Sequence, residues 1–254
     1  MKKPFLHICI FILFTLFAFA PATKENLNVV FIGDSITRGT ASKDQSPPSH
    51  TENMLRQLNQ WKKVQVSNQG RSGNTTLNFL PTSKSAYASV RAAADQFYQD
   101  KTATLVFCIM LGTNDSAIKG PLGSPVSPST YHSNLRTITD SLLSAYPECR
   151  IVFNYPLWYS DNAQNKGAEY KKEGQLRIRA YWPEVDELVK SYKKSHKGQV
   201  FTGDKKAYNY FKENHLTDFR TETGPSGTFY LHPNEQGDKT LAGFWVKAIV
   251  KALK

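Results

Sequence analysis

The stretch that decides the fold of this 254-residue chain is Val29-Val30-Phe31-Ile32-Gly33-Asp34-Ser35-Ile36-Thr37. A continuous apolar, β-branched run ends at a Gly-Asp-Ser turn, which is typical of a strand buried on both faces of a parallel sheet. Ser35 therefore falls just past a strand's carboxyl end, where open α/β sheets bind their ligands. Taken alone, the serine has an ordinary explanation as the N-cap of the next helix.

Outward from this stretch, predicted strands and helices alternate. Apolar runs predict strands at 27–32, 64–68, 104–111, 150–155 and 199–201. Between and after them, apolar residues recur at helical spacing around 87–97, 131–146, 176–192 and 239–253. Strands joined through helices form parallel sheets covered on both faces. We therefore expect an α/β fold, a three-layer α/β/α sandwich around a flavodoxin-like parallel five-stranded sheet, without a second domain.

The first residues resemble a secretory signal peptide. Lys2 and Lys3 precede an apolar run over 5–19, and small residues close it at Ala20-Pro21-Ala22. We expect residues 1–22 to be removed and 23–254 to form one domain of an exported, periplasmic or secreted, protein. A retained membrane anchor is the alternative. No later stretch is apolar for long enough to span a bilayer, so no membrane association is expected after cleavage.

Charge and cysteine usage narrow the class of protein. The formal charge is +11, but the lysines are scattered, which argues against nucleic-acid binding and leaves at most a mild preference for acidic substrates. Cys108 and Cys149 are predicted to be buried thiols, and Cys9 lies in the predicted signal peptide. No Cys-x-x-Cys or His-Glu-x-x-His spacing occurs, so neither a metal nor another cofactor is expected.

Four polar blocks follow strands or precede the last helix. They lie at 33–35, 67–75, 111–115 and 231–234. Each has an ordinary explanation as a turn, a cap or a structural histidine. Together, and in this order, they resemble the SGNH (GDSL) hydrolase family over nearly the whole predicted mature chain. The resemblance implies a serine esterase that works through an acyl-enzyme.

Carried over by position, the resemblance assigns four residues to catalysis. Ser35 would be the nucleophile and His232 the general base. The backbone N–H groups of Ser35 and Gly70 and the side-chain amide of Asn114 would form the oxyanion hole. The family usually has an aspartate three residues before the histidine, but this chain has Phe229 there. The favoured interpretation is a Ser–His dyad oriented by a backbone carbonyl.

A carboxylate from elsewhere in the sequence is the alternative orienting group for His232. The candidates for it are Asp218, Glu222 and Glu235.

For the substrate, the sequence most resembles the sialate- or xylan-type carbohydrate O-acetylesterases. Aromatic residues after the fourth strand could stack on a sugar. The candidate substrate-binding residues are Asp34, Asn74, Asp115, Trp158 and Tyr159. Two alternatives are a lipase or lysophospholipase and a non-catalytic glycan-binding module. The acetylated sugar position and the oligomeric state stay open.

Overall fold

The computed structural model describes residues 25–39 and 45–254, so the predicted signal peptide lies outside the described residues. A parallel five-stranded sheet forms the centre of the molecule, in the order β2-β1-β3-β4-β5. Its strands are β1 (Asn26–Gly33), β2 (Lys63–Gly70), β3 (Ala103–Met110), β4 (Arg150–Phe153) and β5 (Val200–Thr202). This order confirms the flavodoxin-like α/β prediction, with strand ends shifted by one or two residues.

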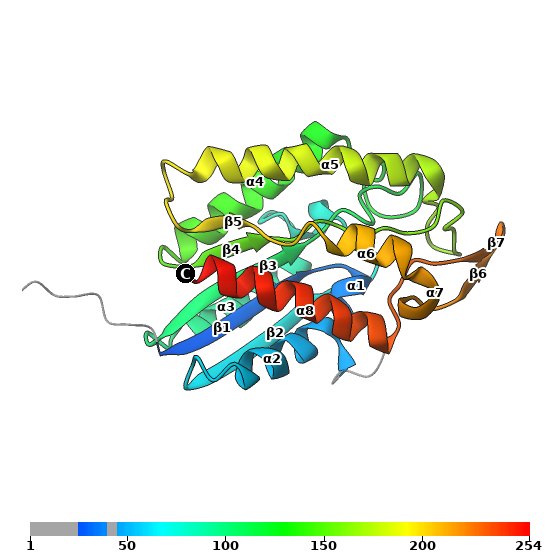
Figure 1. Cartoon of the computed structure of the whole chain (residues 1–254). Coiled ribbons are helices and arrows are strands. Elements are labelled where there is room, and N and C mark those ends of the chain that lie inside the picture. The colour runs from blue at the N-terminus through cyan, green and yellow to red at the C-terminus, as the bar shows by residue number, and fades with distance from the viewer. Residues whose placement is uncertain (1–24, 40–44) are drawn as a thin grey trace, which may run out of the picture.

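Helices cover both faces of the sheet (Figure 1). One face carries α3 (Ala86–Tyr98), α4 (Pro128–Ala145) and α5 (Lys171–Tyr192). The other carries α2 (Pro47–Gln57) and α8 (Glu235–Ala252). Along β1, Val30 and Ile32 pack into the first core, while Val29 and Phe31 pack into the second, where Phe31 stacks on Trp245 at 5.3 Å between ring centroids. Strand β1 is therefore buried on both faces, as its continuous apolar run predicts.

Shorter elements complete the carboxyl edge of the sheet. They are α1 (Ser35–Arg38), the 3-10 helix η2 (Thr76–Phe79), α6 (Ala207–Glu213), α7 (His215–Asp218), β6 (Glu222–Gly224) and β7 (Gly227–Phe229). Strands β6 and β7 form an antiparallel hairpin that the apolar pattern does not predict, because each strand has only three residues. In Figure 1 this hairpin projects from the end of the molecule next to α7.

Both predicted buried thiols are free and buried. Cys108 lies beside Val152 in the sheet register rather than beside Cys149. Within residues 25–39 and 45–254, no helix has the length and apolar character needed to cross a membrane.

Candidate active site

Ser35 begins the short helix α1 directly after β1. The preceding residue, Asp34, is the N-cap of this helix and accepts a 2.9 Å hydrogen bond from the Ile36 backbone N–H. Its side chain is fully buried, and burial raises its pKa to about 6. Asp34 does not line the cleft described below, so the expectation that it binds substrate is wrong. Its buried carboxylate shapes the turn that presents the serine.

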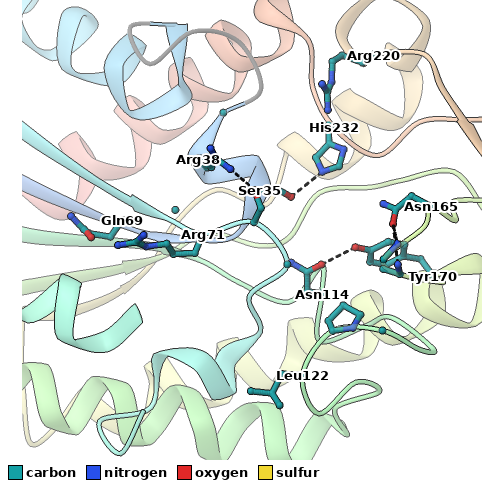
Figure 2. Close-up of a pocket in the computed structure, with 18 of the residues that line it drawn as sticks. Ser35, Arg38, Gln69, Arg71, Asn114, Leu122, Asn165, Tyr170, Arg220 and His232 are labelled. Carbon is teal, nitrogen blue, oxygen red and sulfur yellow. Dashed lines mark hydrogen bonds between the residues drawn. The ribbon is translucent and has the colours of Figure 1, made fainter. Parts of the chain in front are cut away.

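Ser35 and His232, 197 positions apart in the sequence, meet at this edge. The Ser35 Oγ lies 2.9 Å from His232 Nε2 (Figure 2). His232 is held in an extended segment before α8, where its carbonyl accepts a hydrogen bond from the Arg220 backbone N–H at 2.9 Å. Two residues later, Asn234 caps α8. The hydroxyl and the imidazole are thus within proton-transfer distance without rearrangement.

A carboxylate orients the imidazole, so the preference for a backbone carbonyl and a Ser–His dyad is wrong. The two oxygens of Glu222 lie 2.9 and 3.1 Å from His232 Nδ1, and Oε1 also accepts from the His232 backbone N–H at 3.1 Å. The other two candidates lie elsewhere: Asp218 accepts from Tyr210, and Glu235 is exposed at the start of α8.

The position of Glu222 sets the protonation of the pair. Burial raises the pKa of Glu222, but its hydrogen bonds with His232, together with its electrostatic interactions with His232 and Arg220, outweigh burial and leave the pKa below its usual value. An ionised carboxylate only accepts hydrogen bonds, so Nδ1 of His232 carries a proton and donates it to Glu222. In the neutral imidazole, Nε2 is then free to accept the Ser35 hydroxyl proton.

Asn114 lies just after β3, buried against the loop that follows β2. Its Nδ2 donates to the Asn74 carbonyl at 3.0 Å, and its Oδ1 accepts from the Tyr170 hydroxyl at 2.7 Å. These two bonds fix the direction of the amide, since the amide oxygen faces a donor and the amide nitrogen faces an acceptor. One hydrogen of Nδ2 is left for a ligand in the cleft.

Of the two glycines Gly70 and Gly73, the hydrogen bonds favour Gly73 as the donor to an oxyanion. The Gly70 N–H donates to Asn68 Oδ1 at 2.9 Å, so it is already used. Gly73 lies in the same loop with φ +76°, a backbone conformation that favours glycine. Its N–H has no partner among the residues that the structure describes. Gly73 lines the cleft and precedes Asn74, whose carbonyl holds the Asn114 amide.

Four further predicted binding residues have structural contacts instead. The Asp115 carboxylate is buried and accepts from the backbone and hydroxyl of Thr76. Tyr159 is buried, and its hydroxyl contacts Ser116. Trp158 packs in the second core, 5.1 Å from the His215 ring. Asn74 contributes only its carbonyl to Asn114. None of the four is among the residues that line the cleft; burial makes the expectation wrong for Asp115 and Tyr159, and substrate binding by Asn74 or Trp158 stays a prediction.

A cleft of about 1190 Å³ opens over Ser35 and His232. It is bounded by α1, the loop after β2, residues 120–122, residues 165–170 and Arg220. Most of its lining side chains are polar or basic (Figure 2). The apolar side chains that line it are those of Pro121, Leu122 and Ala168. Leu122 is 58% exposed, so these residues form a rim rather than an enclosed apolar channel.

Gly73 and Tyr170 were missed from the sequence, whereas Glu222 was named only as one of three candidates for the group that orients His232. Glu222 had a usable signal, because Gly224-Pro225-Ser226-Gly227 is a turn that predicts a hairpin with Glu222 near Phe229. Gly73 lies in the polar block 67–75 that the sequence pointed to. Only the observed hydrogen bonds show that its N–H, and not that of Gly70, is free to donate. Tyr170 had no local signal, because it lies 56 positions from Asn114. In the described part of the chain, no group of His, Cys, Asp or Glu side chains is arranged to hold a metal ion.

A serine bonded to a histidine that is bonded to a carboxylate, next to unpaired N–H donors, is an arrangement typical of hydrolases with a serine nucleophile. Residues 31–240 match the model of the GDSL-like Lipase/Acylhydrolase family. The chain therefore belongs to this family of ester hydrolases. No curated protein matches its sequence.

Solved structures agree on the fold. An aryl esterase from M. smegmatis superposes with a TM-score of 0.60 at 14% identity, covering 89% of this chain and 99% of that one. A carbohydrate acetylesterase from Sinorhizobium meliloti gives 0.57 at 16% identity, covering 90% and 100%. A lipase/acylhydrolase from Enterococcus faecalis gives 0.56 at 20% identity, covering 88% and 95%. At these identities the likeness concerns the fold alone.

Proposed function

We propose that this GDSL-type ester hydrolase removes O-acetyl, or similarly short acyl, groups from carbohydrates. The observation that carries the proposal is the polar lining of the cleft over Ser35. Sugars present hydroxyl groups that side-chain amides, hydroxyls and guanidinium groups bind well. A long acyl chain would need an apolar channel, and Pro121, Leu122 and Ala168 do not enclose one. The carbohydrate acetylesterase among the structural neighbours is consistent with this substrate class.

The geometry supports a two-step acyl transfer. Ser35 Oγ attacks the acyl carbon while His232 Nε2 takes the hydroxyl proton across the 2.9 Å contact. The carbonyl oxygen becomes an oxyanion, facing the N–H groups of Ser35 and Gly73 and the Asn114 amide. When the C–O bond to the sugar breaks, His232 returns the proton to the leaving sugar oxygen. Water then repeats the sequence on the acyl-serine, releasing acetate and restoring the Ser35 hydroxyl.

Glu222 acts on this reaction through His232. Its carboxylate holds the Nδ1–H tautomer and stabilises the imidazolium that forms when Ser35 loses its proton. The same residue bonds the His232 backbone N–H, so it positions both the ring and the chain segment that carries it.

Turnover of a p-nitrophenyl acyl series tests the proposal. We expect acetate to be the best substrate, turnover to fall with chain length, and Ser35→Ala to lose activity by at least about 1,000-fold. Ser195→Ala is a matched control, because Ser195 Oγ contacts His196 Nδ1 at 3.0 Å on the exposed surface. Acetate release from acetylated xylan, pectin and sialic acid then identifies the sugar.

Two outcomes would replace the proposal. A preference for long acyl chains would indicate a lipase or lysophospholipase. Esterase inactivity of the wild type, with retained glycan binding, would indicate a binding module.

The proposal also includes export of the mature chain, which rests on the predicted signal peptide over 1–22 and is tested by fractionating the host cell.

A further inference from the structure

Three arginines, Arg38, Arg71 and Arg220, line the proposed substrate cleft. Arg38 is the fourth residue of α1, one helical turn from Ser35, so the two side chains lie on the same side of that helix. Arg71 follows β2, where its backbone N–H donates to Gly33. Arg220 pairs by its backbone with His232. In Figure 2, Arg38 lies beside Ser35 and Arg220 lies on the histidine side, while the side chain of Arg71 extends away from the Ser35–His232 pair.

In the described part of the chain, none of these arginines is paired directly with a carboxylate, although the positive charge of Arg220 helps to lower the pKa of Glu222. Arg38 donates to the Ser72 hydroxyl at 3.2 Å and Arg71 to the Ser89 hydroxyl at 2.9 Å, both of which are uncharged partners. Asp218 and Glu222 are the acidic residues closest in sequence to Arg220: Asp218 accepts from the Tyr210 hydroxyl, and both oxygens of Glu222 are bonded to His232.

The acceptors that the described cleft wall offers to these guanidinium groups are uncharged. Among the residues that the structure describes, no Asp or Glu lines the cleft. Each guanidinium has five N–H donors in a planar fork that matches a carboxylate, and a single serine contact leaves most of them unused. The chain as a whole is also basic, with a formal charge of +11, which favours the approach of anions.

We infer that the cleft selects acidic sugars: the substrate is an O-acetylated sugar that carries a carboxylate, which contacts Arg38 and Arg220 while the ester lies over Ser35. The inference rests on the proposed function and deepens it, because it names the substrate class for the same site. Arg71, held toward Ser89, would contribute to the attraction of longer acidic chains rather than to the bound sugar unit. Charged hydrogen bonds of this kind are about twice as strong as neutral ones.

A matched pair of substrates tests the inference directly. Acetylated galacturonic acid and acetylated galactose differ at one carbon, which carries a carboxylate in the first and a hydroxymethyl group in the second. We expect kcat/KM to favour the acidic ester by roughly 10- to 100-fold at low salt, with most of the difference in KM. The preference should shrink as salt is added, because the arginines are exposed to screening. A wild-type enzyme that treats both esters alike would overturn the inference.

Variants that remove one positive charge test whether Arg38 and Arg220 cause the preference for the acidic ester. Arg38→Gln and Arg220→Gln should each reduce the acidic-to-neutral ratio of kcat/KM by about tenfold, and the double variant should bring the ratio near one. Lys197→Gln is the control, because it removes one exposed positive charge from the turn after α5, near the opposite edge of the sheet. A ratio that stays constant in the arginine variants, while both rates fall together, would contradict the assignment.

An inhibition assay separates this inference from the proposed function. Free galacturonate and free galactose carry no ester, so they report binding even if the enzyme does not deacetylate sugars. With p-nitrophenyl acetate as substrate, galacturonate should inhibit the wild type at a concentration at least about tenfold lower than galactose, and Arg220→Gln should remove the difference. Equal inhibition by galacturonate and galactose would overturn the inference of acidic-sugar binding but leave the proposed esterase function unaffected. Stronger inhibition by galactose 6-sulfate than by galacturonate would overturn the carboxylate as the bound group and indicate a sulfated sugar instead.

Discussion

Glu222 and Phe229 lie directly opposite each other in the β6–β7 hairpin. Phe229 occupies the position three residues before His232 where the SGNH family usually has an aspartate, and it is buried. Opposed residues of an antiparallel pair project from the same face. The hairpin therefore supplies from the neighbouring strand the carboxylate that is missing from its usual place, and Glu222 reaches His232 Nδ1 at 2.9 Å.

Glu222→Gln tests the role of this carboxylate. The amide keeps the size of the side chain but offers Nδ1 a donor or a neutral acceptor in place of a charge. We expect kcat to fall by about 100- to 10,000-fold with KM little changed, because the tautomer and the imidazolium lose their support. Steady-state kinetics with p-nitrophenyl acetate measures both constants.

Two companion variants make that result specific. Glu222→Asp keeps the charge on a shorter side chain, so it should recover part of kcat, whereas a purely structural role would not distinguish charge from amide. Glu235→Gln removes an exposed carboxylate near His232 in the sequence and should leave the kinetics unchanged. If Glu222→Gln turned over at the wild-type rate, the carboxylate would not be needed and Ser35 and His232 would act as a dyad.

Tyr170 is predicted to position Asn114. Tyr170→Phe removes the 2.7 Å hydrogen bond to Asn114 Oδ1 and leaves that buried oxygen unpaired. The amide is then free to turn its oxygen toward the oxyanion. We expect kcat to fall about tenfold with little change in KM. Asn114→Ala, which removes the donor itself, should cost about 100- to 1,000-fold in kcat.

Combining the two changes separates positioning from general damage. If Tyr170 acts through Asn114, the double variant should be no slower than Asn114→Ala alone, because nothing is left to position. Independent effects that multiply would show that Tyr170 supports the cleft by another route. Circular dichroism of each variant checks that the fold is retained.

The parts of the site that follow long buried strands were predictable from the sequence. The continuous apolar runs before Ser35 and Asn114 place both residues at the carboxyl edge, and the register of β1 with β3 brings their strand ends level. His232 was expected because its block, at 231–234 before the final helix, resembles the histidine block of the SGNH family. The local patterns predict the fold and the strand ends, whereas the pairing of Ser35 with His232 was expected from the resemblance to the SGNH family.

Contacts that depend on tertiary structure were not predictable in the same way. The orientation of His232 depends on a hairpin of three-residue strands, which has almost no apolar signal. The choice between Gly70 and Gly73 depends on which N–H Asn68 occupies. Trp158 and Tyr159 follow β4 as expected, but packing turns them into the cores. Strand position places a residue at the edge and does not decide whether its side chain faces the cleft.

Asp34 makes a pH-dependent contribution to stability. Burial raises its pKa from 3.8 to about 6 in the folded protein, so the folded state holds this proton more tightly than the unfolded state. Its contribution is therefore most favourable below about pH 4, declines as the pH rises to about 6, and is constant above. Between these limits the free energy of unfolding of wild type minus that of Asp34→Asn should fall by about 3 kcal/mol.

Urea unfolding at several pH values measures this difference, and Asp100→Asn provides a control of opposite sign. Hydrogen bonds from Thr102 and Asn26 lower the pKa of Asp100. Its contribution is lost as the pH falls through that lowered pKa, so wild type minus Asp100→Asn should increase up to about pH 4 and stay level above. A difference for Asp34→Asn that does not change between pH 4 and 6 would show that Asp34 is not buried as a charge.

Gly70 is predicted to matter for packing rather than for its N–H. A Cβ at this position would lie 2.2 Å from the Arg38 backbone nitrogen and 2.7 Å from its Cα, and neither backbone atom can move without shifting α1. Gly70→Ala should therefore cost about 1–3 kcal/mol of stability and also lower kcat, because α1 carries Ser35. Gly243→Ala, inside α8 with open space around the added methyl group, should stabilise by about 0.5–1 kcal/mol. Urea unfolding of both variants measures the two opposite shifts. If Gly70→Ala unfolds at the wild-type midpoint, the close approach of β2 to α1 is not needed to hold the nucleophile.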